Sequence, residues 1–263
     1  MYSKEHKKYL RKIKTNKVLI HITQIFILIS FILLWEFLSK NEYINSFIYS
    51  SPSKIVETLK NLYLENNLFK HIWITIYETI ISFTLSTLIG TLVAIILWYS
   101  KFIYKVLDPY LTIINSLPKV SLGPIIIIIF GANINSIIIM ALLISLILTI
   151  LNVYNGFINT DSNKIKLMKS FGATKIQILT KLIIPYNYHV ILNTIKINVS
   201  MTLIGVIMGE LLVSKEGIGY LINYGSEVFN LNLVFTGILI LLIVSYIMYA
   251  LVSHLEKILI RNN

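Results

Sequence analysis

The chain of 263 residues contains no cysteine, which excludes disulfide bridges, thiolate nucleophiles and cysteine-based metal sites. Its five histidines are scattered without the spacing of a metal site. No GxxxxGK[ST] sequence occurs, so a nucleotide site of that kind does not belong to this chain. An intramembrane enzyme would need a paired set of His, Asp or Ser side chains, and the sequence offers none. We therefore expect no catalytic residues and no resident cofactor or metal.

Hydrophobic residues dominate what is present. They make up 56% of the chain, against 13% charged residues, and they fall in blocks long enough to cross a bilayer. The formal net charge of +11 raises the question of nucleic-acid binding. The basic residues, however, lie at the ends and between the apolar blocks, which is typical of membrane topology. The sequence indicates an all-α integral membrane protein in contact with lipid, with no nucleic-acid partner.

Six apolar segments are predicted to span the membrane, and the third is interrupted by Pro118 and Pro124. The first is expected to stay uncleaved, because Trp35 and Phe37 stand where a signal peptide has small residues. The spans are 18–38, 72–99, 106–130, 136–154, 190–213 and 234–252. The resulting organisation is a basic tail (1–17), a first span with an outer amphipathic segment (18–71), a core of five spans (72–255) with a polar loop (155–189), and a short tail (256–263).

The distribution of basic residues predicts the orientation. Sixteen of the 23 Lys and Arg residues fall on one side if both ends and the 155–189 loop are cytoplasmic, as the positive-inside rule requires of a plasma-membrane protein. Four lysines between residues 39 and 70 fall on the other side. In that segment, an apolar stripe over 55–63 predicts a short helix along the outer face, with Pro52 in its first turn.

The polar loop carries a distinctive pattern. Residues 162–171 are predicted to form a short helix with Ile165, Met168 and Phe171 along one face, ended by Gly172 at positive φ. Pro185, thirteen positions after that glycine, sets the direction in which the next span begins. Such a rigid element can bind in a cleft of a soluble partner. By local pattern alone, an ordinary solvated loop is an equal alternative.

Several polar residues at membrane depth are candidates for a solute path. Lys119 lies between two prolines, and broken backbone at this depth is tolerated where it lines a cavity. A cation there would favour an anionic solute. Ser116, Asn198 and Thr202 are further candidates, with helix packing as the alternative for each. For Glu210, which lies near small residues, path lining and structural anchoring have equal weight.

Ordered motifs give the chain a resemblance to a known family. The chain is similar to the permease subunits of binding-protein-dependent ABC importers for nitrate, sulfonate, taurine and thiamine precursors. The motifs that carry it are SPS at 51–53, LPKVSLGP at 117–124, IFG at 129–131, GVIMGELL at 205–212, and SKEGIGYLI at 214–222, together with the spacing of Gly172 and Pro185. The family's Glu-Ala-Ala is replaced by Lys166, Leu167 and Met168. In the second span the family commonly has an Arg where Glu78 aligns and a Gly where Ser82 aligns.

The resemblance implies a type I importer fold and a function in solute import. Two permease chains, identical or related, would enclose the path. A separate ATPase dimer would bind ATP and magnesium, and an extracytoplasmic binding protein would deliver the solute. The loop positions that the family uses to contact the ATPase match Lys166, Leu167, Met168, Lys169, Ser170, Phe171, Gly172, Ala173 and Pro185. The alternative is a secondary transporter driven by an ion gradient, for which we find no internal repeat.

Overall fold

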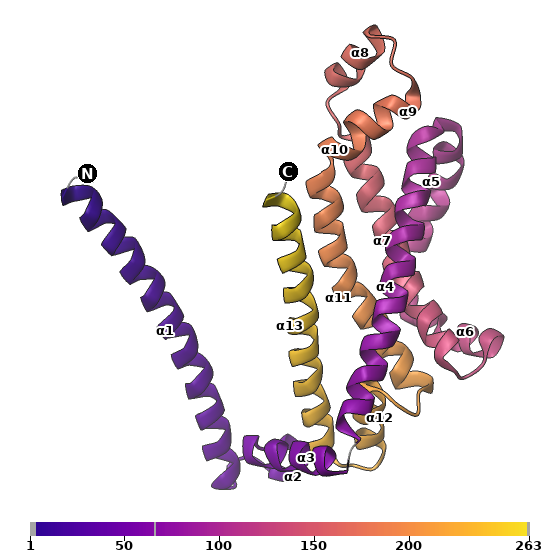
Figure 1. Cartoon of the computed structure of the whole chain (residues 1–263). Helices are drawn as coiled ribbons and strands as arrows, with labels where there is room; N and C mark the ends of the chain where they lie inside the picture. The colour runs from indigo at the N-terminus through magenta and orange to yellow at the C-terminus, as the bar shows by residue number, and fades with distance from the viewer. Residues whose placement is uncertain (1–3, 66, 262–263) are drawn as a thin grey trace.

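The computed structural model describes residues 4–65 and 67–261, which form helices joined by short turns without a β-strand among them (Figure 1). The elements are α1 (Lys4–Lys40), α2 (Ser46–Tyr49), α3 (Pro52–Leu64), α4 (Leu68–Tyr99), α5 (Lys101–Ser116), η1 (Lys119–Leu122), α6 (Gly123–Phe130), α7 (Ile134–Ile158), α8 (Ser162–Ser170), α9 (Lys175–Ile178), η2 (Leu179–Ile183), α10 (Ile184–Tyr186), α11 (Tyr188–Val213), α12 (Ile218–Glu227) and α13 (Leu231–Arg261). The predicted tails are continuous with α1 and α13 as far as they are described, and residues 1–3 and 262–263 lie outside the described residues.

Five of these helices, α1, α4, α7, α11 and α13, are long and apolar enough to cross a membrane, and a bent pair makes up to six. They match five of the six predicted spans, although most extend beyond the predicted limits. The predicted amphipathic helix is α3, whose N-cap Ser51 accepts a hydrogen bond from the amide of Lys54 and whose first turn holds Pro52.

The third predicted span is two helices. The segment that begins with α5 and ends with α6 bends by 92° after Ser116, so α6 does not continue the direction of α5. The cause lies at Leu117, which is extended (φ −67°, ψ 140°), as the residue before a proline prefers. Pro124 begins the first turn of α6 and does not interrupt it. Pro118 therefore makes the break alone.

The core is formed by α4, α7 and α11, with α7 in contact with both of the others along much of its length. Close approach is possible because small residues face each other. A Cβ atom on Gly205 of α11 would lie 2.4 Å from the Cα atom of Ala141 of α7. In a membrane, where burial of apolar surface between helices gives little gain, such tight backbone packing is a main source of helix association.

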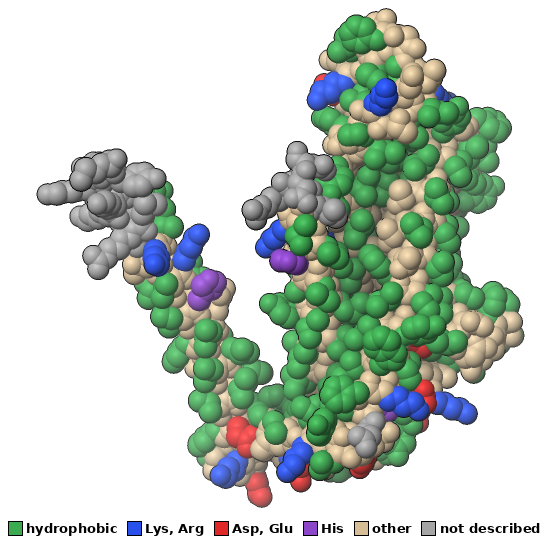
Figure 2. Space-filling model, in the orientation of Figure 1, with side chains coloured by type: hydrophobic (Ala, Val, Ile, Leu, Met, Phe, Trp, Pro, Cys, Tyr) green, Lys and Arg blue, Asp and Glu red, His purple; other side chains and the backbone are tan. Residues whose placement is uncertain are grey.

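Helix α1 stands apart from this core. It contacts α2 and α3 at its end, and Trp35 packs against Phe235 of α13 with ring centroids 5.7 Å apart. The apolar part of α1 is otherwise uncovered in the single chain. Figure 2 shows hydrophobic side chains along the flanks of α1 and of the bundle, with charged side chains gathered toward the two ends. This pattern is that of a surface embedded in lipid.

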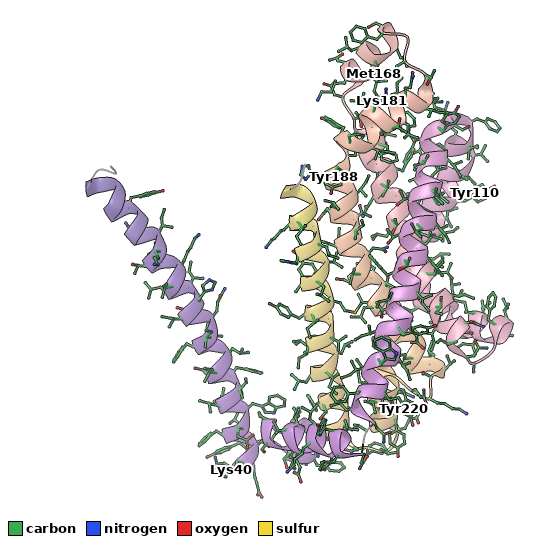
Figure 3. All side chains as sticks on the ribbon, in the orientation of Figure 1. Lys40, Tyr110, Met168, Lys181, Tyr188 and Tyr220 are labelled. Atoms are coloured by element: carbon green, nitrogen blue, oxygen red, sulfur yellow. The ribbon has the colours of Figure 1, made fainter. Side chains whose placement is uncertain are left out.

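The bundle has two distinct ends. The beginning of α1, the end of α13 and the α8 segment lie at one end, which we call the α8 end (Figure 1). The opposite end, called the α12 end, holds α2, α3 and α12. Figure 3 shows Met168 and Lys181 at the α8 end, and Lys40 and Tyr220 at the α12 end. The beginning of α1, the end of α13 and the predicted polar loop (155–189) therefore share one side of the molecule.

Candidate functional site

The predicted loop helix is present as α8. The Asp161 side chain caps its first turn by accepting a hydrogen bond from the amide of Asn163 at 2.9 Å. At the other end, the amide of Gly172 donates to the carbonyl of Lys169, and the amide of Ala173 donates to that of Met168. These two bonds form a Schellman motif, which needs the positive φ of 73° that Gly172 adopts. Both helix ends are thus fixed by local hydrogen bonds.

One face of α8 packs on the bundle and another does not. Ile165 and Met168 contact an apolar cluster built on α4, α7 and the α9–η2 segment, as predicted. Phe171 was expected on the same face, and this expectation is wrong, because the turn that ends the helix begins there and leaves the ring 78% exposed. Leu167 is 55% exposed. We call Leu167 and Phe171 the apolar tip.

The base of the loop is held rigidly. The Asn187 side-chain amide donates to the Thr160 hydroxyl at 2.7 Å and to the Ile183 carbonyl at 2.9 Å, and both side chains are buried. These bonds join the end of α7 to the beginning of α11. Pro185 lies in the first turn of α10, immediately after the π-helical turn η2. A π-turn there fits the missing amide of proline, which cannot donate to the carbonyl four residues earlier.

Lysines surround the apolar tip and are held in two different ways. Lys164 lies over the ring of Tyr186, with its Nζ atom 4.4 Å from the ring centroid. Lys175 lies 4.8 Å from the centroid of Tyr99 and also donates to that residue's carbonyl, which links the loop to the end of α4. The remaining predicted contact residues of the helix, Lys166, Lys169 and Ser170, are exposed to the surroundings.

The predicted path residues fall into two groups. Ser116 and Lys119 lie on the α5–η1 segment, where Lys119 donates to the Asn115 carbonyl at 3.1 Å and Ser116 to the Ile113 carbonyl at 2.8 Å. No residue of α5 is buried within the chain, so this helix presents an open face. Exposed side chains on this helix are both polar, as at Asn115, and apolar, as at Ile113 and Tyr110, and Figure 3 labels the last of these. The structure therefore places Ser116 and Lys119 at an accessible surface.

Asn198 and Thr202 lie inside the bundle. The Asn198 amide donates to the hydroxyls of Ser86 at 3.0 Å and Thr87 at 2.7 Å, which joins α11 to α4. The Thr202 hydroxyl donates to the Asn198 carbonyl at 2.8 Å. Both residues are fully buried, and the geometry matches the helix-packing alternative named for them.

Glu210 is also buried, with only 1% of its surface exposed. Its carboxyl group accepts hydrogen bonds from the Thr75 hydroxyl at 2.6 Å and from the Gly219 amide at 2.5 Å. The first bond joins α11 to α4, and the second joins α11 to α12. Of the two roles given equal weight for Glu210, the contacts within this chain match structural anchoring.

Sequence reasoning missed the rest of this assembly. The Gly217 amide donates to Nδ1 of His71, and the Ile218 amide donates to the Thr75 hydroxyl, each at 2.9 Å. The turn before α12 is therefore held by α4 as well as by Glu210. The available signal was the GIG sequence, because side chains at 217 and 219 would collide with Glu210. Nothing in the sequence pairs positions 71 and 75 with that turn.

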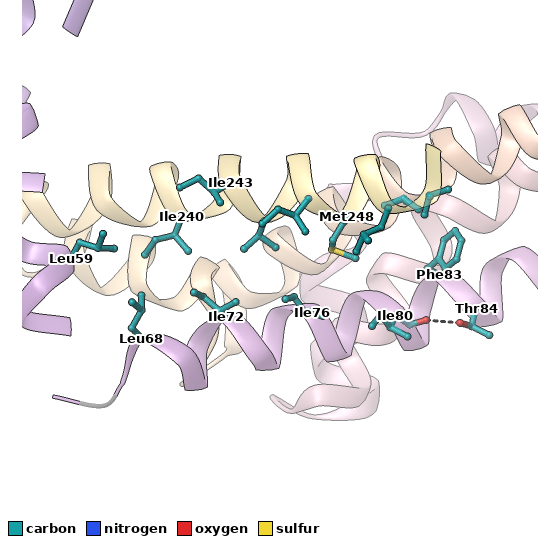
Figure 4. Close-up of a pocket in the computed structure, with 15 residues that line it drawn as sticks. Leu59, Leu68, Ile72, Ile76, Ile80, Phe83, Thr84, Ile240, Ile243 and Met248 are labelled. Carbon is teal, nitrogen blue, oxygen red and sulfur yellow. Dashed lines mark hydrogen bonds between the residues drawn. The ribbon is translucent and has the colours of Figure 1, made fainter. Parts of the chain in front are cut away.

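A large groove on the bundle is apolar. It has a volume of about 490 Å³ and lies between α4 and α13, lined by residues such as Leu59, Ile72, Phe83, Ile240 and Ile247 (Figure 4). The hydroxyl of Thr84, a polar group in its wall, donates to the Ile80 carbonyl at 2.7 Å. A polar solute would find almost no hydrogen-bond partner there, which separates this groove from a solute path.

Residues 86–261, about two thirds of the chain, match the family model described as "Binding-protein-dependent transport system inner membrane component". The chain belongs to this family. It is therefore a multi-pass membrane permease of the ABC importer class, and the alternative of a secondary transporter is not supported.

The curated relatives of this chain are also transport permeases. The chain is 27% identical to a Bacillus subtilis protein described as an aliphatic sulfonates transport permease, over 88% of this chain and 83% of that one. It is 28% identical to the formylaminopyrimidine transport permease of Halalkalibacterium halodurans, over 81% and 85% of the two chains. It is 20% identical to the taurine transport permease of Escherichia coli, over 81% and 80%.

The fold also matches that of a solved transporter. An inward-facing structure of the MetNI methionine ABC transporter contains a chain that superposes with a TM-score of 0.65 at 18% identity. The match covers 74% of this chain and 96% of that chain. The predicted fold class, an all-helical importer permease, is thereby confirmed.

Proposed function

We propose that this chain is the permease subunit of an ATP-driven importer and that its 162–185 loop transmits the movements of a separate ATPase. ATP and magnesium bind in that ATPase, and this chain carries out no hydrolysis. A solute-binding protein outside the cell delivers the solute. The solute is a small anionic or heterocyclic nutrient, of the sulfonate, nitrate, taurine or thiamine-precursor type. Relatives named for sulfonates, taurine and formylaminopyrimidine match most of the chain's length and support this class.

The apolar tip is the observation that carries this proposal. Exposed aliphatic and aromatic side chains in a polar, lysine-rich loop need a partner surface to cover them. The capped helix and the Thr160–Asn187 bond hold that tip in a fixed relation to α7 and α11. A movement imposed on the tip is therefore passed to two core helices. Lysines around it favour an acidic cleft on the ATPase.

The same end of the bundle is proposed to be cytoplasmic. It holds the beginning of α1, the end of α13 and the five lysines of the loop, and the positive-inside rule places such an end in the cytoplasm. The α12 end then faces the binding protein. Both termini are cytoplasmic in this arrangement.

The solute path is proposed to run between two permease chains, along their α5–η1 segments. These segments carry no buried residue in the single chain, and apolar side chains such as Ile113 and Leu117 stand beside Ser116 and Lys119. A second copy, or a related subunit, would cover the apolar side chains and leave the polar ones at the path. Lys119 then provides a positive charge for an anionic solute.

Asn198, Thr202 and Glu210 have a different role in this proposal. Asn198 bonds α11 to α4, Glu210 bonds α11 to α4 and α12, and Thr202 bonds within α11, so these residues maintain the frame on which the path is built. Substitution of these residues should lower stability before it alters solute preference.

Transport in sealed vesicles tests the proposal. The chain is reconstituted with its ATPase and binding protein, and solute uptake is measured with and without ATP on the ATPase side. Uptake should require ATP and persist when an uncoupler collapses the proton gradient. Uptake that needs no ATPase and stops with the uncoupler would indicate a secondary transporter and overturn the proposal.

The same vesicles identify the solute. Sulfonates, nitrate, taurine and pyrimidine precursors of thiamine are offered separately, each with the cognate binding protein present. The Lys119→Gln variant is compared with wild type for each compound that is taken up. A loss confined to anionic compounds would support the role of Lys119 in the path, and an equal loss for all compounds would contradict it.

A further inference from the structure

Two buried carboxyl groups meet at the α12 end. Glu78 of α4 is 2% exposed and Glu210 of α11 is 1% exposed. Glu210 accepts a hydrogen bond from Thr75, which lies one turn before Glu78 on the same face of α4, so the two carboxyl groups face each other between these helices. An ionised carboxylate has acceptors only, so a hydrogen bond between two carboxyl groups requires that one of them carry a proton. Two ionised carboxylates at such a distance in a buried site would repel each other strongly.

The other partners of Glu210 indicate which group is ionised. One Glu210 oxygen accepts from the Thr75 hydroxyl and the other from the Gly219 amide. Both donors stabilise a negative charge on Glu210. Glu78 has no such donors: its Oε2 atom is buried without a hydrogen-bond partner, and the residue lines a cavity of about 350 Å³. The remaining contact of Glu210 is therefore satisfied if Glu78 is the acid that donates.

Among the described residues, no Lys, Arg or His side chain forms an ion pair or hydrogen bond with Glu78 or Glu210. On α4, Lys70 pairs with Glu216 at the surface, and Nδ1 of His71 accepts a hydrogen bond from the Gly217 amide, so that nitrogen carries no proton. Lys215 of the preceding turn is exposed at the rim of the cavity, and α12 presents Tyr220 to His71. The neighbouring part of α7 contributes only uncharged side chains.

We propose that Glu78 and Glu210 form an acid pair that binds a single proton, held by Glu78 and shared with Glu210. The bound proton fastens the turn before α12 to α4 and α11, because Glu210 can hold Gly219 and Thr75 only while no second negative charge stands beside it. Removal of the proton leaves two like charges against one another and loosens α12. The cavity beside Glu78 gives hydroxide or water a route to it. Alkaline pH at the α12 end thus weakens the packing of this end, independently of any ATPase at the other end.

Infrared spectroscopy of the full-length chain in lipid tests for the proton directly. Wild type at neutral pH should show the C=O stretching band of a buried, protonated carboxyl group. The band should be lost in Glu78→Gln and retained in Glu216→Gln, a matched control that removes an acid from the surface pair with Lys70. Absence of the band in wild type, or its persistence in Glu78→Gln, would overturn the proposal.

Thermal unfolding of the same chain provides a second readout. Glu78→Gln keeps a side-chain donor for Glu210 and should lower Tm by no more than about 2 °C. Glu210→Gln places an amide NH₂ against groups that are themselves donors, and it should lower Tm several times more. Wild-type Tm should fall as pH is raised above neutral, and this fall should disappear in Glu78→Gln. Equal losses in the two variants, or an unchanged pH dependence, would contradict the acid pair.

A metal cation could bind the two carboxylates in place of the proton. Unfolding is therefore measured at fixed pH in sodium, potassium and a bulky organic cation. The acid pair predicts the same Tm in all three salts at equal ionic strength. A Tm that rises with one inorganic cation and loses this dependence in Glu78→Gln would show that the site binds that ion and would overturn the proposal of a proton.

Discussion

The loop at the α8 end exposes apolar side chains, whereas the turn at the α12 end buries acidic ones. At the first, Leu167 and Phe171 stand outside a helix that is closed by its own caps. At the second, Glu78 and Glu210 are hidden beneath a glycine turn that is held by other helices. Each end therefore has a side-chain arrangement that would be unfavourable in an isolated soluble protein.

The difference shows where each end obtains its stability. The two ends of α8 are fixed by hydrogen bonds near in sequence, and one face packs on the bundle, so the helix can move as a unit with the bundle when a partner binds the apolar tip. The α12 turn is fixed by groups about 140 residues away in the chain, such as Thr75 bonding to Ile218 and Glu210. It should therefore respond to any change in the packing of α4 against α11.

The largest expected effect is on the apolar tip. The Leu167→Asp, Phe171→Asp double variant places two charges on a surface that is proposed to be covered by the ATPase. We expect ATP-driven uptake to fall at least about tenfold, because burying two unpaired charges costs several kcal/mol. Chain stability should change little, since both side chains are exposed. Uptake in reconstituted vesicles and Tm are measured together.

The matched control is Asn163→Asp, which adds a negative charge to the first turn of the same helix. A charge there favours the helix and lies away from the apolar tip. Uptake should stay near the wild-type level. If the control lost as much uptake as the double variant, the loss would come from added negative charge anywhere on α8, and the apolar tip would have no special role.

The next effect compares two glycines at positive φ. Gly217→Ala should destabilise the chain by about 3 kcal/mol, since its Cβ would meet the Glu210 carboxyl group and force apart buried hydrogen bonds. Gly172→Ala meets no atom within 4 Å and should cost only about 1 kcal/mol of backbone strain. Denaturation of the purified chains measures both. Equal costs would show that the two turns are held alike.

A smaller effect is expected at the base of the loop. Asn187→Ala removes the bonds that join α7 to α11 and should cost about 1–3 kcal/mol, because the Thr160 hydroxyl is left buried without its partner. If the loop transmits movement, uptake should fall more than ATP hydrolysis does in the assembled transporter. A parallel fall of both activities would indicate loss of folding alone.

The smallest effect concerns the lysines of the loop. Lys175→Gln removes the contact with the Tyr99 ring and should cost about 0.5–1 kcal/mol. Lys181→Gln, at an exposed position of the same segment, should leave stability unchanged. Tm of the two variants, measured in the same salt, distinguishes them, and an equal shift would mean that net charge matters more than the contact.

The sequence predicted the α8 end of the molecule better than the α12 end. The five long helices, the cap at Gly172 and the packing of Ile165 and Met168 depend on apolar periodicity and local turn chemistry, and these are visible in a single sequence. The direction of Phe171 was predicted wrongly because the helix ends one residue earlier than the pattern suggested. The 92° bend could be located at Pro118, but its angle could not be predicted, since it depends on contacts between segments that lie apart in the sequence.

The acidic assembly at the α12 end could not be derived in the same way. Glu210 and the glycines were noticed, yet their partners Thr75 and His71 lie in another helix, and no spacing rule connects them. Burying an acidic side chain in a membrane helix is usually costly, so there was no reason in the sequence to expect Glu78 to be buried beside Glu210. The reason is the contact between the two helices, which only the structure shows.

Cross-linking tests the central claim most directly, because the chain has no cysteine and a single one can be introduced cleanly. Phe171→Cys at the apolar tip is compared with Tyr43→Cys, which is 74% exposed and lies three residues after Lys40, the residue that Figure 3 labels at the α12 end. With a thiol-reactive cross-linker, Phe171→Cys should join the ATPase, stop ATP-driven uptake and recover when the link is cleaved, whereas Tyr43→Cys should not join it. A link formed at residue 43 instead, or full uptake with residue 171 permanently linked, would contradict the account.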